Sequence, residues 1–288
     1  MTSIAADQLL AWQRDGWLVL REAFSSETIA ALDTGVTELS AWAASGGPGL
    51  HHFEQTGSGP ALARSERFAD DHTVLGSFVT TGPVLDHVAS VLGEAAVLFK
   101  EKVNYKHPGG GGFAPHQDAT AYRFVDHHVS AMVPLDSSTI ASGCLSFAPG
   151  YRRGQLDTDD RGRIAEHAAG ALDWQPIEAE PGDLVLFDSY APHYSESNTT
   201  DRSRRALYLT YNAARLGDHR ARYYADKEAE FARLGESFDG ERVRISINDD
   251  FLGVPVAAPY TEATEPDATG LDATASDATE RDPAGSNT

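Results

Sequence analysis

The chain has 288 residues and a mass of 30.9 kDa, which suits one large domain or two small ones with ample core for independent folding. Acidic residues outnumber basic ones by 43 to 23, and the net charge of -20 argues against a surface that binds nucleic acid or an anionic membrane. No apolar run approaches the roughly 20 residues that span a bilayer, and the N-terminus lacks the features of a secretory signal, so we expect a cytoplasmic protein. Cys144 is the single cysteine, which excludes an intrachain disulfide and a cysteine-based zinc site.

The N-terminal third is predicted to be mainly helical. A short amphipathic helix is expected at 8–14, and a strand follows at 16–20. A helix-cap signal at Ser25 precedes apolar residues spaced three or four apart, which indicates a long helix. Another helix fits residues 83–92, and Gly93 has the position of its C-terminal stop.

The middle of the chain changes to short apolar runs that are separated by turn residues. This pattern is typical of an all-β sandwich or jelly roll. The glycine-rich segment 108–112 is predicted to be a mobile or close-approach loop rather than a phosphate loop, because no Gly-Lys-Ser/Thr sequence follows it. A charged helix is expected at 218–234. The strands are expected at 97–105, 129–135, 144–148, 183–187 and 206–212.

The last residues, 258–288, differ in composition from the rest of the chain. They hold seven acids, one base and a short Asp-Ala-Thr repeat, so this segment carries -6 of the total charge. Such a segment cannot bury enough apolar area to offset the entropy of ordering it. We therefore predict one domain at 1–257, with a helical N-terminal support and a jelly-roll core, followed by a disordered acidic tail at 258–288.

A candidate metal site begins directly after the glycine-rich segment. His116 and Asp118 are two residues apart, and in an extended chain their side chains project to the same face, where they can bind one ion. His193, which follows an apolar strand and a proline, is the best candidate for a third ligand. Two histidines and one carboxylate form the facial triad that suits non-haem Fe(II), and they leave positions open for a bidentate cosubstrate and for O2.

A basic cluster follows the second histidine, just before the strand expected at 206–212. A 2-oxoglutarate cosubstrate needs a guanidinium group for its distal carboxylate, with a hydroxyl group as a helper. Arg204 and Ser195 can supply these groups. The alternative is that the arginines here are solvated turn charges, which is the interpretation that we prefer for Arg202.

The order of these motifs resembles that of the phytanoyl-CoA dioxygenase family of Fe(II)/2-oxoglutarate oxygenases. His-x-Asp is followed 75 residues later by a second histidine, and then by Ser, Asn and Arg at the spacing of that family. The resemblance extends from about residue 16 to about 214. It implies a mostly β fold with flanking helices and a double-stranded β-helix (jelly-roll, cupin-like) core. It also implies that His116, Asp118 and His193 are the iron ligands.

The resemblance extends to the residues that bind 2-oxoglutarate. It implies that Arg204 binds the distal carboxylate and that Ser195 assists. The Lys-Val-Asn-Tyr-Lys segment that begins at Lys102 is similar to a strand of the ectoine hydroxylases, which belong to the same family. That similarity implies that Asn104 and Lys106 contact the cosubstrate and that Lys102 faces the substrate.

The chain contains only four lysines, and three of them fall on one short strand. Lys100, Lys102 and Lys106 can share one face of that strand, which suits a small anionic ligand. The alternative is an exposed edge strand that its lysines protect from aggregation.

The segments around this strand and the iron pair look most like the bacterial branch that hydroxylates small organophosphonates such as 2-aminoethylphosphonate. We therefore expect a dioxygenase that hydroxylates a C–H bond of a small, anionic molecule and releases succinate and CO2. Tyr122 and Arg123 are candidates to line the substrate pocket, with strand packing and a surface salt bridge as the alternatives. Two other functions stay open: a tailoring hydroxylase for an amino acid or natural product, and a non-catalytic cupin-like binding protein. The sequence also leaves the oligomeric state open.

Overall fold

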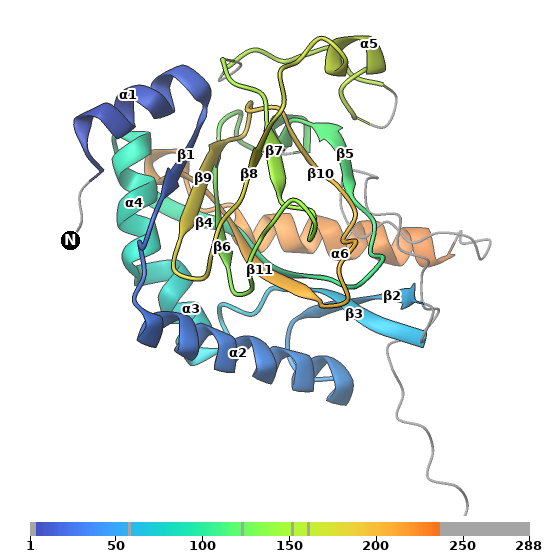
Figure 1. The fold of residues 1–288 in the computed structure, drawn as a ribbon. Coiled ribbons are helices and arrows are strands. Elements are labelled where there is room, and N and C mark those ends of the chain that lie inside the picture. The colour runs from blue at the N-terminus through green and yellow to red at the C-terminus, as the bar shows by residue number, and fades with distance from the viewer. Residues whose placement is uncertain (1–3, 57–58, 122–123, 151–152, 160–161, 237–288) are drawn as a thin grey trace, which may run out of the picture.

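The computed structural model describes residues 4–56, 59–121, 124–150, 153–159 and 162–236. Two antiparallel sheets face each other in a jelly roll, and helices cover the larger sheet (Figure 1). The predicted fold class is thereby confirmed. The larger sheet has the order β1 (Trp17–Leu20), β9 (Leu184–Asp188), β6 (Val129–Pro134), β11 (Arg204–Ala213), β4 (Ala96–Lys106), β3 (Gly59–Glu66) and β2 (Leu50–Thr56). The smaller sheet has the order β5 (Phe113–His116), β10 (His193–Ser195), β7 (Leu145–Phe147) and β8 (Gln175–Ile177).

All four expected helices are present, and the structure adds two that were not predicted, at Thr73–Thr81 and Glu166–Ala169. Ser25 caps the long helix, since its hydroxyl accepts a hydrogen bond from the Thr28 amide at 3.3 Å, and an alanine there would cost about 1 kcal/mol. Gly93 adopts a left-handed conformation with φ of 75° and ends the helix Pro83–Leu92, as predicted. The helices are α1 (Ala6–Asp15), α2 (Ser26–Ser45), α3 (Thr73–Thr81), α4 (Pro83–Leu92), α5 (Glu166–Ala169) and α6 (Arg220–Glu236), with short 3-10 turns at Asp118–Ala121 and Ala214–Leu216.

In the larger sheet, strand β9 buries both of its faces and is apolar on both sides for this reason. In β9, Leu184 and Leu186 pack in the core beneath the helices, whereas Val185 and Phe187 pack between the two sheets. This alternation follows from the period of two residues in a strand. The result is a separate core on each face of this part of the sheet, and the sheet between them is the support on which the site is built.

Strand β4 lies in the interior of the larger sheet. It pairs with β11 on one side and with β3 on the other. The interpretation of the lysine strand as an exposed edge strand is therefore wrong, because neither side of β4 is free. Its pairing sets Lys102 opposite Glu66 of β3 and Tyr208 of β11, and it sets Asn104 opposite Arg64.

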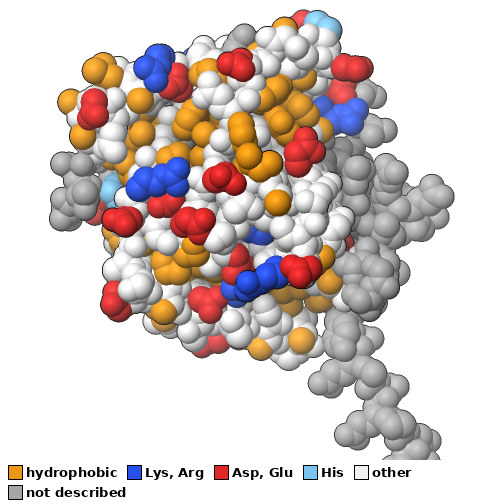
Figure 2. Space-filling view, viewed as in Figure 1, with side chains coloured by type: hydrophobic (Ala, Val, Ile, Leu, Met, Phe, Trp, Pro, Cys, Tyr) orange, Lys and Arg blue, Asp and Glu red, His pale blue; other side chains and the backbone are white. Residues whose placement is uncertain are grey.

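The surface agrees with the acidic composition. On the face that Figure 2 shows, acidic side chains are scattered among a few basic ones and no basic patch forms. Within the described ranges, no helix combines the length and the apolar character that a membrane crossing requires. The segment predicted to be an acidic tail, 258–288, lies outside the described residues.

Candidate metal centre and active-site cavity

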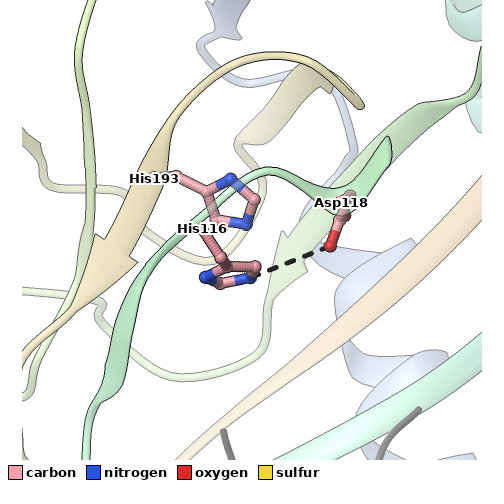
Figure 3. A group of neighbouring side chains, drawn as sticks. All are labelled: His116, Asp118 and His193. Carbon is pink, nitrogen blue, oxygen red and sulfur yellow. Dashed lines mark ion pairs between the residues drawn. The ribbon is translucent and has the colours of Figure 1, made fainter. Parts of the chain in front are cut away.

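The three predicted metal ligands lie together inside the jelly roll. His116 ends β5, Asp118 begins the 3-10 turn after it, and His193 begins β10. Strands β5 and β10 are antiparallel, and His193 is the direct cross-strand partner of His116. One potential ligand atom from each residue lies within 4.8 Å of the others, and the three side chains point toward one another (Figure 3).

Hydrogen bonds to the backbone fix the orientation of both imidazole rings. Nδ1 of His116 lies 2.7 Å from the Ala114 carbonyl oxygen, and Nδ1 of His193 lies 3.0 Å from that of Ala191. A carbonyl oxygen can only accept, so each Nδ1 carries the proton and each Nε2 keeps its lone pair. Because metal-binding histidines are held in this way, the rings are set to bind an ion through Nε2.

The electrostatics of the three groups also fit a divalent cation. Burial opposes charge on Asp118, but His193, Lys100 and His116 nearby hold the pKa of its carboxyl well below its usual range. Burial lowers the pKa of His193, which favours the neutral imidazole that a metal needs. Ser130 donates a hydrogen bond of 3.2 Å to the second oxygen of Asp118. Two neutral nitrogen donors and one carboxylate match the donor set of non-haem Fe(II).

Arg204 lies at the start of β11 and is only 4% exposed. Its terminal NH1 group donates to the Ser138 hydroxyl at 2.8 Å, but its Nε group is buried without a hydrogen-bond partner in the described part of the chain. A buried charged donor without an acceptor is costly, so this geometry fits an arginine that receives a carboxylate ligand.

Two adjoining cavities connect the metal ligands with this arginine. The first, of about 460 Å³ and partly open to solvent, is lined by the three metal ligands together with other polar groups. The second, of about 290 Å³, is lined by Arg204 and Lys106. Asn104 and Phe113 line both cavities, so space for an elongated cosubstrate extends from the metal ligands toward the guanidinium group.

The structure gathers most of the predicted site residues around these cavities. Lys102, Asn104 and Ser195 line the first cavity. The Lys106 ammonium donates to the Ser195 hydroxyl at 3.0 Å, to the Gly143 carbonyl at 3.2 Å and to the Glu196 carbonyl, so its three protons are used within the protein. Burial and the nearby Arg204 lower the pKa of Lys106 to about 7. Two further candidates, Tyr122 and Arg123, lie outside the described residues.

Sequence reasoning missed several residues of the cavity. Tyr208 and Thr210 of β11 line it, and so does Ser130 of β6. The first two could have been found, because they follow Arg204 at even spacing on a predicted strand and therefore share its face. Arg64 of β3, whose Nε donates to the Asn104 side chain at 3.0 Å, carried no such signal because its strand was not predicted.

Comparison with known proteins agrees with this geometry. A model of the phytanoyl-CoA dioxygenase (PhyH) family matches residues 12–206. The chain belongs to this family. It is 43% identical to the methylphosphonate hydroxylase of Gimesia maris, over 88% of this chain and 98% of that protein. It is 38% identical to a 2-aminoethylphosphonate dioxygenase from an uncultured bacterium, over 89% of this chain and all of that protein.

A solved structure of the same fold is that of EctD from S. alaskensis with 2-oxoglutarate and 5-hydroxyectoine. It superimposes with a TM-score of 0.64 at 24% identity, over 74% of this chain and 77% of that one. Together, the family match and these relatives identify the protein as a 2-oxoglutarate-dependent dioxygenase that is similar in sequence to organophosphonate hydroxylases. They leave the alternative of a non-catalytic cupin-like binding protein without support.

Proposed function

We propose that the protein hydroxylates a C–H bond of a small organophosphonate, with 2-oxoglutarate and O2 as cosubstrates and succinate and CO2 as further products. One observation carries the choice of substrate. The Lys102 ammonium lines the same cavity as the metal ligands, and it makes no hydrogen bond or ion pair with any described residue. The ammonium lies over the Tyr208 ring, at 5.4 Å from the ring centre.

An ammonium group in this environment favours an anionic ligand. Burial, together with Arg64 and Lys100 nearby, lowers the pKa of Lys102 well below its ordinary value. Keeping such a group charged without an opposite charge is unfavourable, and a bound anion removes this cost. Lys100 lines the same cavity and adds a second cation. Two ammonium groups suit the dianionic phosphonate head group, which offers three acceptor oxygens.

In this proposal, the metal and the cosubstrate occupy the positions that the donor groups prepare for them. His116, Asp118 and His193 hold Fe(II), which together with 2-oxoglutarate supplies the power to oxidise a C–H bond. The buried Nε group of Arg204 receives the distal carboxylate of the cosubstrate. Ser195 accepts from Lys106, so its own hydroxyl proton is available for the same carboxylate. Lys106 acts through Ser195, and Asn104 lies along the path between metal and arginine.

The role of the lysines is to orient the substrate. Lys100 and Lys102 lie on the β4 wall of the cavity, whereas the two histidine ligands lie on the opposite sheet and Asp118 lies in the turn after β5. A phosphonate group bound to the lysines therefore directs its carbon substituent across the cavity toward the metal. Holding the reacting carbon in a fixed position is a large part of what an enzyme contributes to such a reaction.

The test is succinate release by the Fe(II)-loaded protein in the presence of 2-oxoglutarate. The substrate panel contains methylphosphonate and 2-aminoethylphosphonate, each matched with its carboxylate analogue. We expect one phosphonate to stimulate succinate release while its carboxylate analogue does not. Slow succinate release that does not depend on the added substrate would overturn the assignment of a phosphonate substrate. It would favour a tailoring hydroxylase for an amino acid or natural product. An absence of succinate from protein that holds iron would overturn the catalytic assignment.

A further inference from the structure

A buried ionic cluster lies beside the proposed phosphonate site. It consists of Glu66 and Arg64 from β3 and Lys227 from α6, and these side chains are 3%, 1% and 2% exposed. One oxygen of Glu66 lies 3.3 Å from the Arg64 NH1 group, and the other oxygen accepts from the Lys227 ammonium. Lys227 is the one lysine of the chain outside β4, and the fold brings it to the same region of the sheet.

The position of Glu66 is unusual for a carboxylate that does not contact the neighbouring lysine. Glu66 is the direct cross-strand partner of Lys102, and residues paired in this way share a face of the sheet. Opposite charges in such positions ordinarily pair with each other. Here the two oxygens of Glu66 are bonded to Arg64 and Lys227 instead, and the Lys102 ammonium has no ion pair within the described ranges.

Without these partners, Glu66 would compete with the substrate anion for the Lys102 ammonium. Burial opposes its charge, but Lys227 and Arg64 hold the pKa of its carboxyl well below the usual range, so it is ionised at neutral pH. If this carboxylate paired with Lys102, it would occupy the cation that the phosphonate needs. With Arg64 and Lys227 both bound to it, the negative charge of Glu66 is instead compensated within the cluster.

We propose that Lys227 is a positioning residue for substrate binding: by holding Glu66, it keeps the Lys102 ammonium available for the substrate anion. This inference rests on the proposed function. It makes α6, which lies against β4 (Figure 1), a part of the active site, although the proposed metal ligands lie on other elements. The helix also contributes Tyr223, whose ring centre lies 5.7 Å from the Lys100 ammonium.

Contacts other than those of Lys227 attach α6 to the sheet. Arg220 forms two hydrogen bonds, of 2.6 and 2.9 Å, with the carboxylate of Glu101, and the Tyr224 hydroxyl donates to the Glu101 carbonyl at 2.9 Å. A change at Lys227 therefore leaves the main attachment of the helix in place. This separation makes the effect on the substrate measurable in a folded protein.

The test compares Lys227→Met with Lys227→Arg and with the double variant Lys227→Met/Glu66→Gln. In the single methionine variant, Glu66 loses one partner and turns to Lys102, so KM for the phosphonate should rise about tenfold while KM for 2-oxoglutarate stays within about twofold. The arginine variant keeps the positive charge and should restore KM. The double variant removes the competing charge and should return KM for the phosphonate to within about threefold of the wild type.

A second measurement reads the state of Lys102 without any substrate. The rate of its acetylation, followed by mass spectrometry of the peptide that contains it, should fall in Lys227→Met, because an ion pair with Glu66 protects the protonated amine. The rate should recover in the double variant. Unchanged acetylation in Lys227→Met would overturn the role of Lys227, and so would a double variant that remains as impaired as the single one. Failure of the phosphonate panel with the wild type would instead overturn the proposed substrate, and the acetylation result would still decide the role of Lys227.

Discussion

At the scale of single residues, His116 tests the metal centre most directly. Replacing it by alanine removes one of two nitrogen donors, and we expect iron binding to be lost and turnover to fall at least about 100-fold. The measurements are the iron content after gel filtration and the rate of succinate release. His167→Ala is the matched control, since this histidine is exposed on the surface, and it should behave as the wild type. Substantial activity in His116→Ala would remove this residue from the set of ligands.

Arg204 gives a second test, directed at the cosubstrate. Arg204→Ala removes the buried guanidinium group whose Nε lacks a partner in the described ranges, so KM for 2-oxoglutarate should rise at least about tenfold. KM for the phosphonate should change much less. Arg202→Ala serves as the control, because this exposed side chain is interpreted as a solvated turn charge. If KM for the phosphonate rose and KM for 2-oxoglutarate did not, the assignment of Arg204 to the distal carboxylate of 2-oxoglutarate would be wrong.

The lysines of β4 predict a pH dependence. Burial lowers the pKa of Lys100 to about 8, although Asp118 nearby acts in the opposite direction. Below pH 8 the group is an ammonium that attracts the phosphonate, and it loses this charge as the pH rises through 8. We therefore expect KM for the phosphonate to rise above pH 8. The ionisation of the phosphonate cannot cause this effect, because the substrate gains negative charge as the pH rises.

Lys100→Arg is the control for this pH dependence. The guanidinium group of the introduced arginine stays protonated up to at least about pH 12. The rise in KM for the phosphonate above pH 8 should therefore weaken in this variant. An equal rise in the variant would assign the titration to another group.

At the scale of elements, the glycine-rich segment before β5 sets the distance between β5 and β10. A Cβ atom on Gly112 would lie 2.1 Å from the Ser195 carbonyl oxygen, whereas one on Gly111 would meet no atom within 4 Å. Gly112→Ala should therefore push β5 away from β10, which carry His116 and His193, and lower iron affinity and activity at least about tenfold. Gly111→Ala should leave both unchanged. Equal behaviour of the two variants in an iron titration would contradict this role of the close approach.

The same elements show what local sequence can predict. Helices α1 and α6 and the strands β4, β6, β9 and β11 were predicted within a few residues, because their apolar periodicity is strong. The three-residue strands β7, β8 and β10 owe their conformation to pairing with neighbours that are distant in sequence. Of these, only β7 was predicted. Strands β2 and β3 were missed because their side chains include histidines, prolines and charged groups without the usual apolar alternation.

At the scale of the whole molecule, contacts between residues that are far apart along the chain are what sequence reasoning fails to predict. The proposed metal ligands and Arg204 could be singled out in the sequence because each lies beside a locally recognisable motif or strand. Arg64, Glu66 and Lys227 could not be joined into one cluster, since Lys227 lies some 160 residues after the other two and nothing local connects them. Only the docking of α6 against the sheet brings their charges together.

The largest change that the molecule should tolerate is the removal of residues 258–288. These residues carry -6 of the net charge of -20, and their composition offers little apolar area for docking on the domain. We expect a protein truncated after residue 257 to keep its activity and its melting temperature within about 2 °C, because the contacts of α6 remain. A protein truncated after residue 219 provides the contrast, since it also loses α6 and leaves Glu66 and Glu101 without their partners on this helix. That shorter protein should lose phosphonate turnover and unfold at a clearly lower temperature. A large loss after the first truncation would show that the acidic segment docks on the domain.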